Sequence, residues 1–132
     1  MKSTRRKMLG AAALGLASAG AAPGQVRSGN FVFLSGIGGW YPERRPKAGD
    51  IREQTADALT IMKNSLEKAG SSLEKVVKVS VALVDPETNW EPMNQVYDTF
   101  FTKKKPARSY WGATGFRRRG QLLQIDCIAY VD

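Results

Sequence analysis

The alternation of hydrophobic and polar positions predicts two short strands near the start of the chain. They lie within residues 26–35 and are joined at Ser28-Gly29-Asn30, because these residue types favour tight turns. Residues 31–34 are apolar on both faces, so we expect this segment to be well buried. A loop rich in glycine, proline and charge follows as far as residue 49 and belongs on the surface.

A helix is predicted to begin after Asp50, which can form a capping box with Glu53. Gly70 is placed to end the helix, since glycine readily adopts a positive φ. Between them one stripe recurs at helical spacing, formed by Ile51, Thr55, Leu59, Met62 and Leu66. The ordinary interpretation of this stripe is core packing.

Residues 76–84 form the strongest predicted strand, and both of its faces are largely apolar. One face would carry Val77, Val79, Val81 and Leu83, and the other Val76, Ala82 and Val84. A strand that is apolar on both sides needs cover on both sides.

A second helix, capped by Asn89, is predicted next, and two strands at 107–113 and 121–131 complete the chain. The helix carries apolar residues at helical spacing: Trp90, Met93, Val96, Tyr97, Phe100 and Phe101. The order β-β-α-β-α-β-β predicts an α+β fold, a sheet with two helices on one face. The opposite face would be exposed in a single copy, so we expect an obligate oligomer.

The first 22 residues have the pattern of an export signal, which leaves 23–132 as the folded domain. A basic head precedes an Ala/Gly/Leu run, and small residues at 17–21 offer cleavage sites. Arg5 and Arg6 resemble a twin-arginine signal, which predicts a periplasmic or secreted protein. The run is shorter than the ~20 residues of a spanning helix, so no permanent membrane anchor is expected. A Sec signal, or a cytoplasmic protein with a disordered tail, stays open as an alternative.

The net charge and the rare residue types limit which classes of function fit the sequence. The chain has 20 basic and 12 acidic residues, net +8, and without the four basic residues of the signal the net charge is +4. That surplus does not require a nucleic-acid partner, and the basic runs 103–105 and 117–119 are short enough to be solvated turns.

Histidine is absent and Cys127 is the single cysteine. The missing histidine argues against a zinc site or a Ser-His-Asp triad. Cys127 lies in an apolar strand and is expected to be a buried small hydrophobe without a disulfide partner.

Arg108 is the strongest candidate for a binding residue. Pro106 favours entry into a strand, which places Arg108 just inside the strand at 107–113. A guanidinium there is a rigid fork of donors that suits a carboxylate or a phosphate. The alternative is a surface arginine in an ordinary ion pair.

Several segments come in the order and rough spacing of the RidA (YjgF-type) proteins, and the resemblance covers nearly all of residues 25–131. They are 30–36 (NFVFLSG), 54–55 (QT), 69–79 (AGSSLEKVVKV), 94–97 (NQVY), 100–101 (FF) and 106–108 (PAR). The resemblance implies a chorismate-mutase-like α+β fold and a homotrimer with clefts between subunits. It also implies a substrate class: reactive 2-imino or 2-enamino acids, hydrolysed to 2-oxo acids and ammonia.

The resemblance assigns roles to particular residues of this chain. The family arginine that matches Arg108 holds the substrate carboxylate. Ser35 and Gly36 would line the same cleft, Asn94 matches an asparagine that borders it, and Tyr110 stands where a small residue or cysteine often follows the Arg-Ser pair. No metal and no organic cofactor are implied.

Gln124 departs from the family pattern. It falls on the position of a glutamate thought to orient or deprotonate the attacking water. An amide can hold a water but cannot accept its proton at neutral pH, so catalysis is expected to be weakened. Asp126 follows on the same face of the strand and could substitute only in a reshaped cleft. Trp111 adds bulk beside Tyr110.

Three functions are therefore considered. The first is hydrolytic deamination of small 2-imino or 2-enamino acids, and the second is non-catalytic binding of small carboxylates or aromatic ligands on the same trimer. The third is RNA binding or cleavage, also claimed for the family. The two basic runs are its sequence support, and an exported protein would rarely meet RNA.

Overall fold

The computed structural model describes residues 24–132, and the predicted export signal at 1–22 lies outside them. The described part contains five strands, two α-helices and one short 3₁₀ helix in the predicted order. They are β2 (Gln25–Ser28), β3 (Phe31–Gly38), α1 (Ile51–Lys68), η1 (Leu73–Lys75), β4 (Val76–Val84), α2 (Pro86–Phe100), β5 (Ala107–Ala113) and β6 (Leu123–Tyr130).

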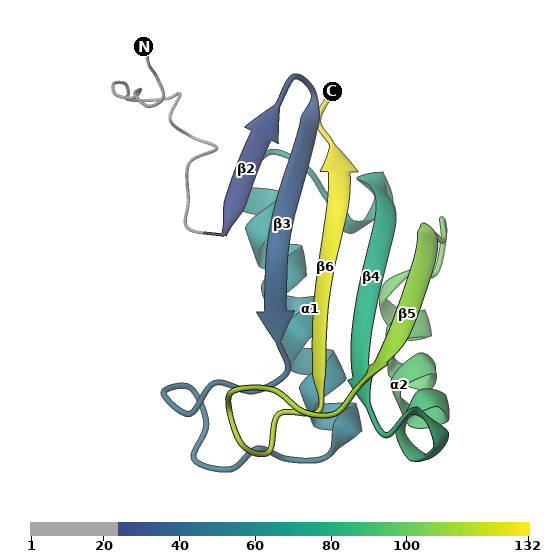
Figure 1. Ribbon diagram of the computed structural model, residues 1–132. Helices are drawn as coiled ribbons and strands as arrows, with labels where there is room; N and C mark the ends of the chain where they lie inside the picture. The colour runs from purple at the N-terminus through teal and green to yellow at the C-terminus, as the bar shows by residue number, and fades with distance from the viewer. Residues whose placement is uncertain (1–23) are drawn as a thin grey trace.

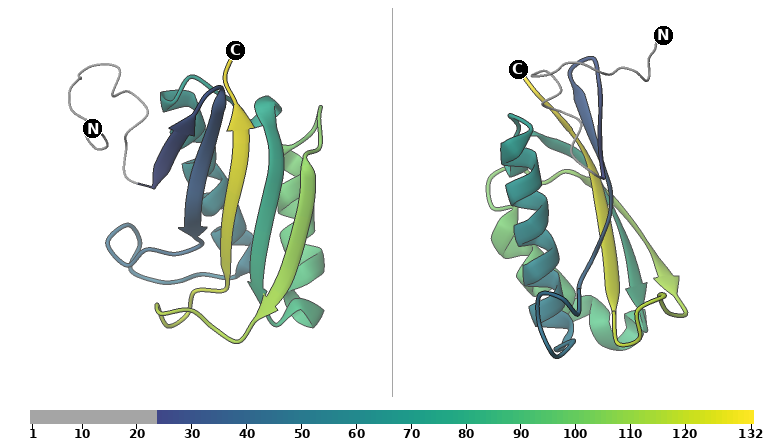
Figure 2. Two further views of the ribbon diagram at one scale, coloured as in Figure 1. Left: turned by 45° about the horizontal axis from the view of Figure 1, so that its top comes forward. Right: turned by 90° about the vertical axis from the view of Figure 1, so that its left-hand side faces the viewer.

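The strands form one mixed sheet in the order β2-β3-β6-β4-β5 (Figure 1). β4 and β5 are parallel, as expected for strands joined through a helix, and the other neighbours are antiparallel. Both helices lie on the same side of the sheet (Figure 2). The predicted α+β fold with two helices on one face is therefore confirmed.

The core lies between the sheet and the helices. Alternate side chains of β4 and β6 face it, and each is at most 2% exposed: Val79, Val81, Leu83, Leu123, Ile125, Cys127 and Ala129. α1 contributes Leu59, Met62 and Leu66, which confirms its predicted stripe. Burial raises the pKa of the Cys127 thiol to about 12, so this cysteine is the inert small hydrophobe that was predicted.

Local signals at the ends of α1 were predicted correctly. Asp50 and Glu53 form a reciprocal capping box, and Gly70 adopts φ +86° just beyond the helix.

The start of α2 was not predicted correctly. Asp85 precedes Pro86 in the left-handed conformation, and Asn89 lies inside the helix with its amide donating to the carbonyl of Val84 at 2.7 Å. Proline fits the first helical position, so the helix begins before the predicted cap.

The start of β4 differs from the predicted alternation. A register shift between Val76 and Lys78 forms a β-bulge, so Val76 faces the core at 3% exposure and Val77 is 41% exposed. Simple alternation had placed Val77 with Val79. One extra residue in a strand reverses the faces of the residues before it.

The face of the sheet away from the helices has no cover within the described residues. Phe31 and Phe33 were expected to be buried but are 47% and 40% exposed on this face, beside Val26 at 63%. The expected exposed apolar face therefore exists, although β2 and β3 supply more of it than β4.

No helix of the described part is long and apolar enough to cross a membrane.

Removing the Asp50 side chain should lower the free energy of unfolding by about 1 kcal/mol. The Asp50 side chain accepts a hydrogen bond from the Glu53 N–H, and the Glu53 side chain accepts one from the Asp50 N–H. The measurement is the urea midpoint of Asp50→Ala at fixed protein concentration. Ser72 begins η1 without a side-chain capping bond, so Ser72→Ala is the control. An equal loss in both variants would contradict the capping role.

Candidate functional site

Arg108 lies on the helix side of edge strand β5, where it is paired in register with Val79. Its guanidinium carbon is 4.3 Å from the centre of the Tyr97 ring and 5.0 Å from that of Trp90. Both rings come from α2 and are seven residues apart, so they share one face of the helix. The guanidinium is thus stacked against two aromatic faces, a favourable contact for a cation.

Arg108 has no carboxylate partner among residues 24–132. The ion pairs of this part of the chain use other cations: Arg45–Asp57, Lys63–Glu67, Lys75–Asp132, Lys103–Glu74 and Lys105–Asp98. The alternative of an ordinary ion pair within the described chain is therefore not what the structure shows. The positive charge of Arg108 remains available to an anion from outside.

Three buried polar atoms without a hydrogen-bond partner in the described part of the chain belong to this region. They are Nη1 of Arg108, the hydroxyl of Tyr97 and Oδ1 of Asn94. Asn94 lies between Trp90 and Tyr97 at helical spacing, so it occupies the same face of α2. Burial raises the pKa of Tyr97 to about 12, against the opposing charge of Arg108, so its hydroxyl stays protonated at neutral pH. Unpartnered buried groups are rare, and their concentration here is typical of a site for a polar ligand or water.

Tyr110 extends the aromatic surface beside Arg108. It lies two residues further along β5 and so on the same side of the strand. Its ring packs against Trp90 with centres 4.4 Å apart and the ring planes tilted by 41°, and the residue remains 48% exposed. Trp111 pairs with Ala82 on the opposite side of the sheet. The two aromatic residues that were expected to crowd one cleft therefore face in opposite directions.

Ser35, Gly36 and Gln124 form a second group on the open face of the sheet. Ser35 and Gly36 occupy a bulge in β3, between Leu34 and Ile37. The Gln124 side chain lies directly over Gly36, where an added Cβ would come within 2.5 Å of its amide nitrogen. Glycine at this position therefore makes room for the Gln124 amide.

Asp126 is the next residue of β6 on the open face, opposite Ser80. It is half-buried, and burial raises the pKa of its carboxyl. Among residues 24–132 no three cysteine, aspartate or glutamate side chains gather closely enough to hold a metal ion.

The expected site residues thus fall into two groups that a single copy does not bring together. Arg108, Asn94 and Tyr110 lie on the helix side at β5, whereas Ser35, Gly36 and Gln124 lie on the open side at β3 and β6. Strand β4 separates β5 from β6 (Figure 1).

Trp90 and Tyr97 were not predicted as partners of Arg108, because the sequence indicated only that they recur at helical spacing. The spacing of 90, 94 and 97 was the available signal.

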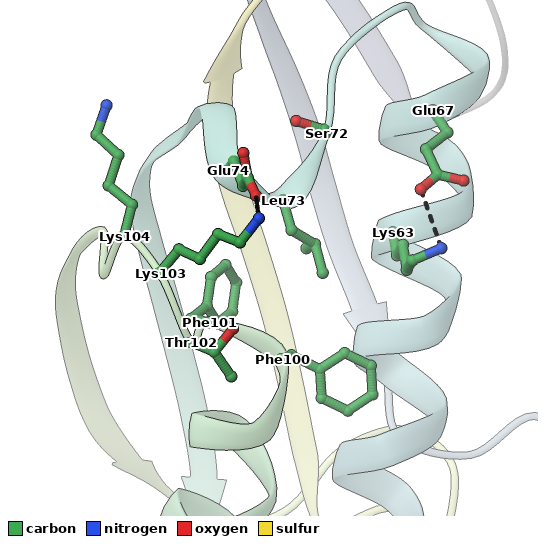
Figure 3. Close-up of a pocket in the computed structure, with 10 residues that line it drawn as sticks. All are labelled: Lys63, Glu67, Ser72, Leu73, Glu74, Phe100, Phe101, Thr102, Lys103 and Lys104. Carbon is green, nitrogen blue, oxygen red and sulfur yellow. Dashed lines mark ion pairs between the residues drawn. The ribbon is translucent and has the colours of Figure 1, made fainter.

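A groove of about 410 Å³ lies elsewhere, between the end of α1, η1 and the end of α2 (Figure 3). Its lining includes Leu73, Phe100 and the ion pairs Lys63–Glu67 and Lys103–Glu74. None of the expected site residues lines this groove.

The basic run 103–105 precedes β5, and the basic run 117–119 follows β5, so the two runs lie at opposite ends of this strand and do not form one patch.

Comparisons with known proteins agree with this fold. A family described as Endoribonuclease L-PSP matches residues 15–131. A RutC family protein of Pyrococcus abyssi is 38% identical over 106 residues, which cover 80% of this chain and 82% of that protein. A protein of Dermatophagoides farinae named 2-iminobutanoate/2-iminopropanoate deaminase is 31% identical over 108 residues, 81% of this chain and 83% of that protein.

The crystal structure of yeast Mmf1 superposes with a TM-score of 0.75 at 33% identity, covering 83% of this chain and 86% of that one. Names of other relatives assign them to mitochondria or chloroplasts. The match to the family over nearly the whole domain confirms the resemblance drawn from the motifs. The chain therefore belongs to the Endoribonuclease L-PSP family, that is, the YjgF/RidA family.

Proposed function

We propose that the protein hydrolyses reactive 2-imino or 2-enamino acids to 2-oxo acids and ammonia. The observation that carries this proposal is Arg108, a cation on two aromatic rings with no acidic partner among the described residues. The deaminase names of relatives support the same chemistry.

Arg108 would bind the substrate carboxylate through charge-assisted hydrogen bonds, worth roughly 1.5–3 kcal/mol. The Tyr97 hydroxyl is protonated at neutral pH and has no partner among the described residues, so it can donate to the same carboxylate. Oδ1 of Asn94 can only accept, so it suits an N–H group of the substrate or a water. The three groups together fit an acid that carries nitrogen next to its carboxylate.

The hydrolytic half of the site would use the amide of Gln124, which packs against Gly36, to hold the attacking water. An imine carbon is already electrophilic, so orienting it and a water supplies much of the rate. Without a carboxylate base the reaction would be slower by roughly 10²–10⁴.

We propose further that the protein is a homotrimer whose sites lie between copies. The two groups of site residues lie on opposite sides of the sheet, so one copy cannot present both to a small acid. The exposed Val26, Phe31 and Phe33 supply an apolar surface for association.

Non-catalytic binding of a small carboxylate is the second candidate function. Gln124 favours it, because the binding half contains an arginine while the water-holding half has an amide in place of a base.

An imine-consumption assay separates these two functions. Imines of alanine or 2-aminobutanoate are generated in situ with an amino-acid oxidase, and their loss is followed. We expect the wild type to accelerate this loss, Arg108→Ala to abolish the acceleration and Gln124→Glu to increase it. Arg27 is an exposed arginine on β2 whose side chain bonds to the carbonyl of Gly29, so Arg27→Ala is the control and should match the wild type.

If the wild type and Arg108→Ala are equally inert, while pyruvate stabilises only the wild type against heat, the protein is a binder. If pyruvate stabilises both or neither, Arg108 does not bind the carboxylate.

Mixing two inactive variants tests whether sites form between copies. Arg108→Ala lacks the binding half, and Gly36→Val should displace Gln124 from the other half. After mixing in denaturant and refolding together, about a quarter of the sites should be intact if each draws its halves from different copies. Recovery no greater than the sum of the two separately refolded variants would contradict shared sites.

We also propose that residues 1–22 direct export through a twin-arginine pathway, on the evidence of their sequence alone. Replacing Arg5 and Arg6 by lysine preserves charge but removes the paired guanidinium groups. The double variant should remain inside the cells of the native host, measured by fractionation. Export of the double variant at the wild-type level would indicate a Sec signal. Retention of the wild type as well as the double variant inside the cell would contradict the export proposal.

A further inference from the structure

We infer that the aromatic wall formed by Tyr110 and Trp90 selects substrates with a flat, ring-bearing side chain, so that the preferred substrates are aromatic 2-imino acids. The inference rests on the proposed function, because it names the side chain of the acid whose carboxylate Arg108 would bind. It depends on how three neighbouring side chains of β5 and α2 are arranged.

Trp90 contacts both ends of this arrangement. The guanidinium carbon of Arg108 is 5.0 Å from the centre of the Trp90 ring, and the Tyr110 ring is 4.4 Å from it. Arg108 and Tyr110 also project from the same side of one strand, about 7 Å apart along it. A cation and a continuous aromatic surface therefore lie side by side.

Tyr110 is 48% exposed although it lies on the helix side of the sheet, because β5 is an edge strand. Trp90 supports one side of the Tyr110 ring, and much of the rest remains open to a ligand. The tilted contact with Trp90 also restricts the Tyr110 ring before any ligand binds, so little side-chain freedom is lost on binding.

The spacing fits an aromatic acid better than a short one. In an acid with one CH₂ between its imine carbon and a ring, the ring projects away from the carboxylate, so it can extend toward Tyr110 while the carboxylate is bound at Arg108, two residues earlier on the same side of the strand. A methyl side chain would leave the Tyr110 ring in water. Offset or edge-to-face contact between rings favours binding by about three- to tenfold over the same acid without a ring contact.

Neighbouring Trp111 supplies a matched control. It is an aromatic residue of nearly the same exposure, 53%, one position along the same strand, but it lies on the other side of the sheet. Replacing either residue by serine removes a similar exposed ring. Only the change at 110 removes the ring beside Arg108.

The experiment compares phenylpyruvate with pyruvate, the 2-oxo acids of the two substrate types, by titration calorimetry on wild type, Tyr110→Ser, Tyr110→Phe and Trp111→Ser. The same variants are assayed with imines generated from phenylalanine and alanine. We expect the wild type to prefer the aromatic member of each pair. Tyr110→Ser should reduce that preference three- to tenfold, whereas Tyr110→Phe and Trp111→Ser should retain it.

Equal affinity of the wild type for both acids, or a preference that survives in Tyr110→Ser, would overturn the inference. An equal loss in Tyr110→Ser and Trp111→Ser would also overturn it, since the wall would then not be specific to the Arg108 side. If the wild type prefers aromatic acids but consumes no imine, the proposed hydrolysis is contradicted and the inferred preference for aromatic ligands is supported. If imines are consumed without a ring preference, the ligand class fails and the catalysis stands.

Discussion

The placement of one guanidinium on two aromatic faces is the interaction on which the candidate site depends. Arg108 is carried by an edge strand and lies against Tyr97 and Trp90 of the helix that precedes it. Removing a cation from water is costly, and aromatic faces offset only part of that cost. The described chain supplies no carboxylate for it. An anionic ligand would complete the arrangement, and that is why the proposed function begins at this residue.

The sheet determines how the rest of the site can be assembled. Both helices cover one face, so the side chains of each strand divide between a closed and an open side. Arg108 lies on the closed side at the edge, and Gln124 lies on the open side over Gly36. An acid of a few atoms cannot contact both within one copy. The exposed phenylalanines of β3 provide a reason for copies to associate, and association is what would bring complementary halves together.

Local features of the fold could be predicted from the sequence because they depend on neighbouring residues. The capping box of Asp50 and Glu53, the left-handed Gly70 and the bounds of β4 and β5 are of this kind. The exposure of Phe31 and Phe33 could not, because apolar character alone does not reveal which strands supply the uncovered face of the sheet. The bulge at Val76 and the helix start at Pro86 were missed because alternation and capping rules each admit a competing local solution.

The site was predicted in the same uneven way. Arg108 and Gln124 could be proposed as site residues from motif position, but their division between opposite sides of the sheet required the register of β4, β5 and β6. The partners Trp90 and Tyr97 resemble ordinary core residues in the sequence, and Tyr97 is indeed only 3% exposed. What distinguishes Tyr97 is an unpartnered hydroxyl, which only coordinates can reveal.

The most direct test of this account is a crystal structure of the assembled protein with bound 2-oxobutanoate. The account predicts the carboxylate on Arg108 of one copy, with Ser35, Gly36 and Gln124 of a neighbouring copy facing the same ligand. A guanidinium paired with an acidic side chain of a neighbouring copy, or a ligand bound away from Arg108, would contradict it.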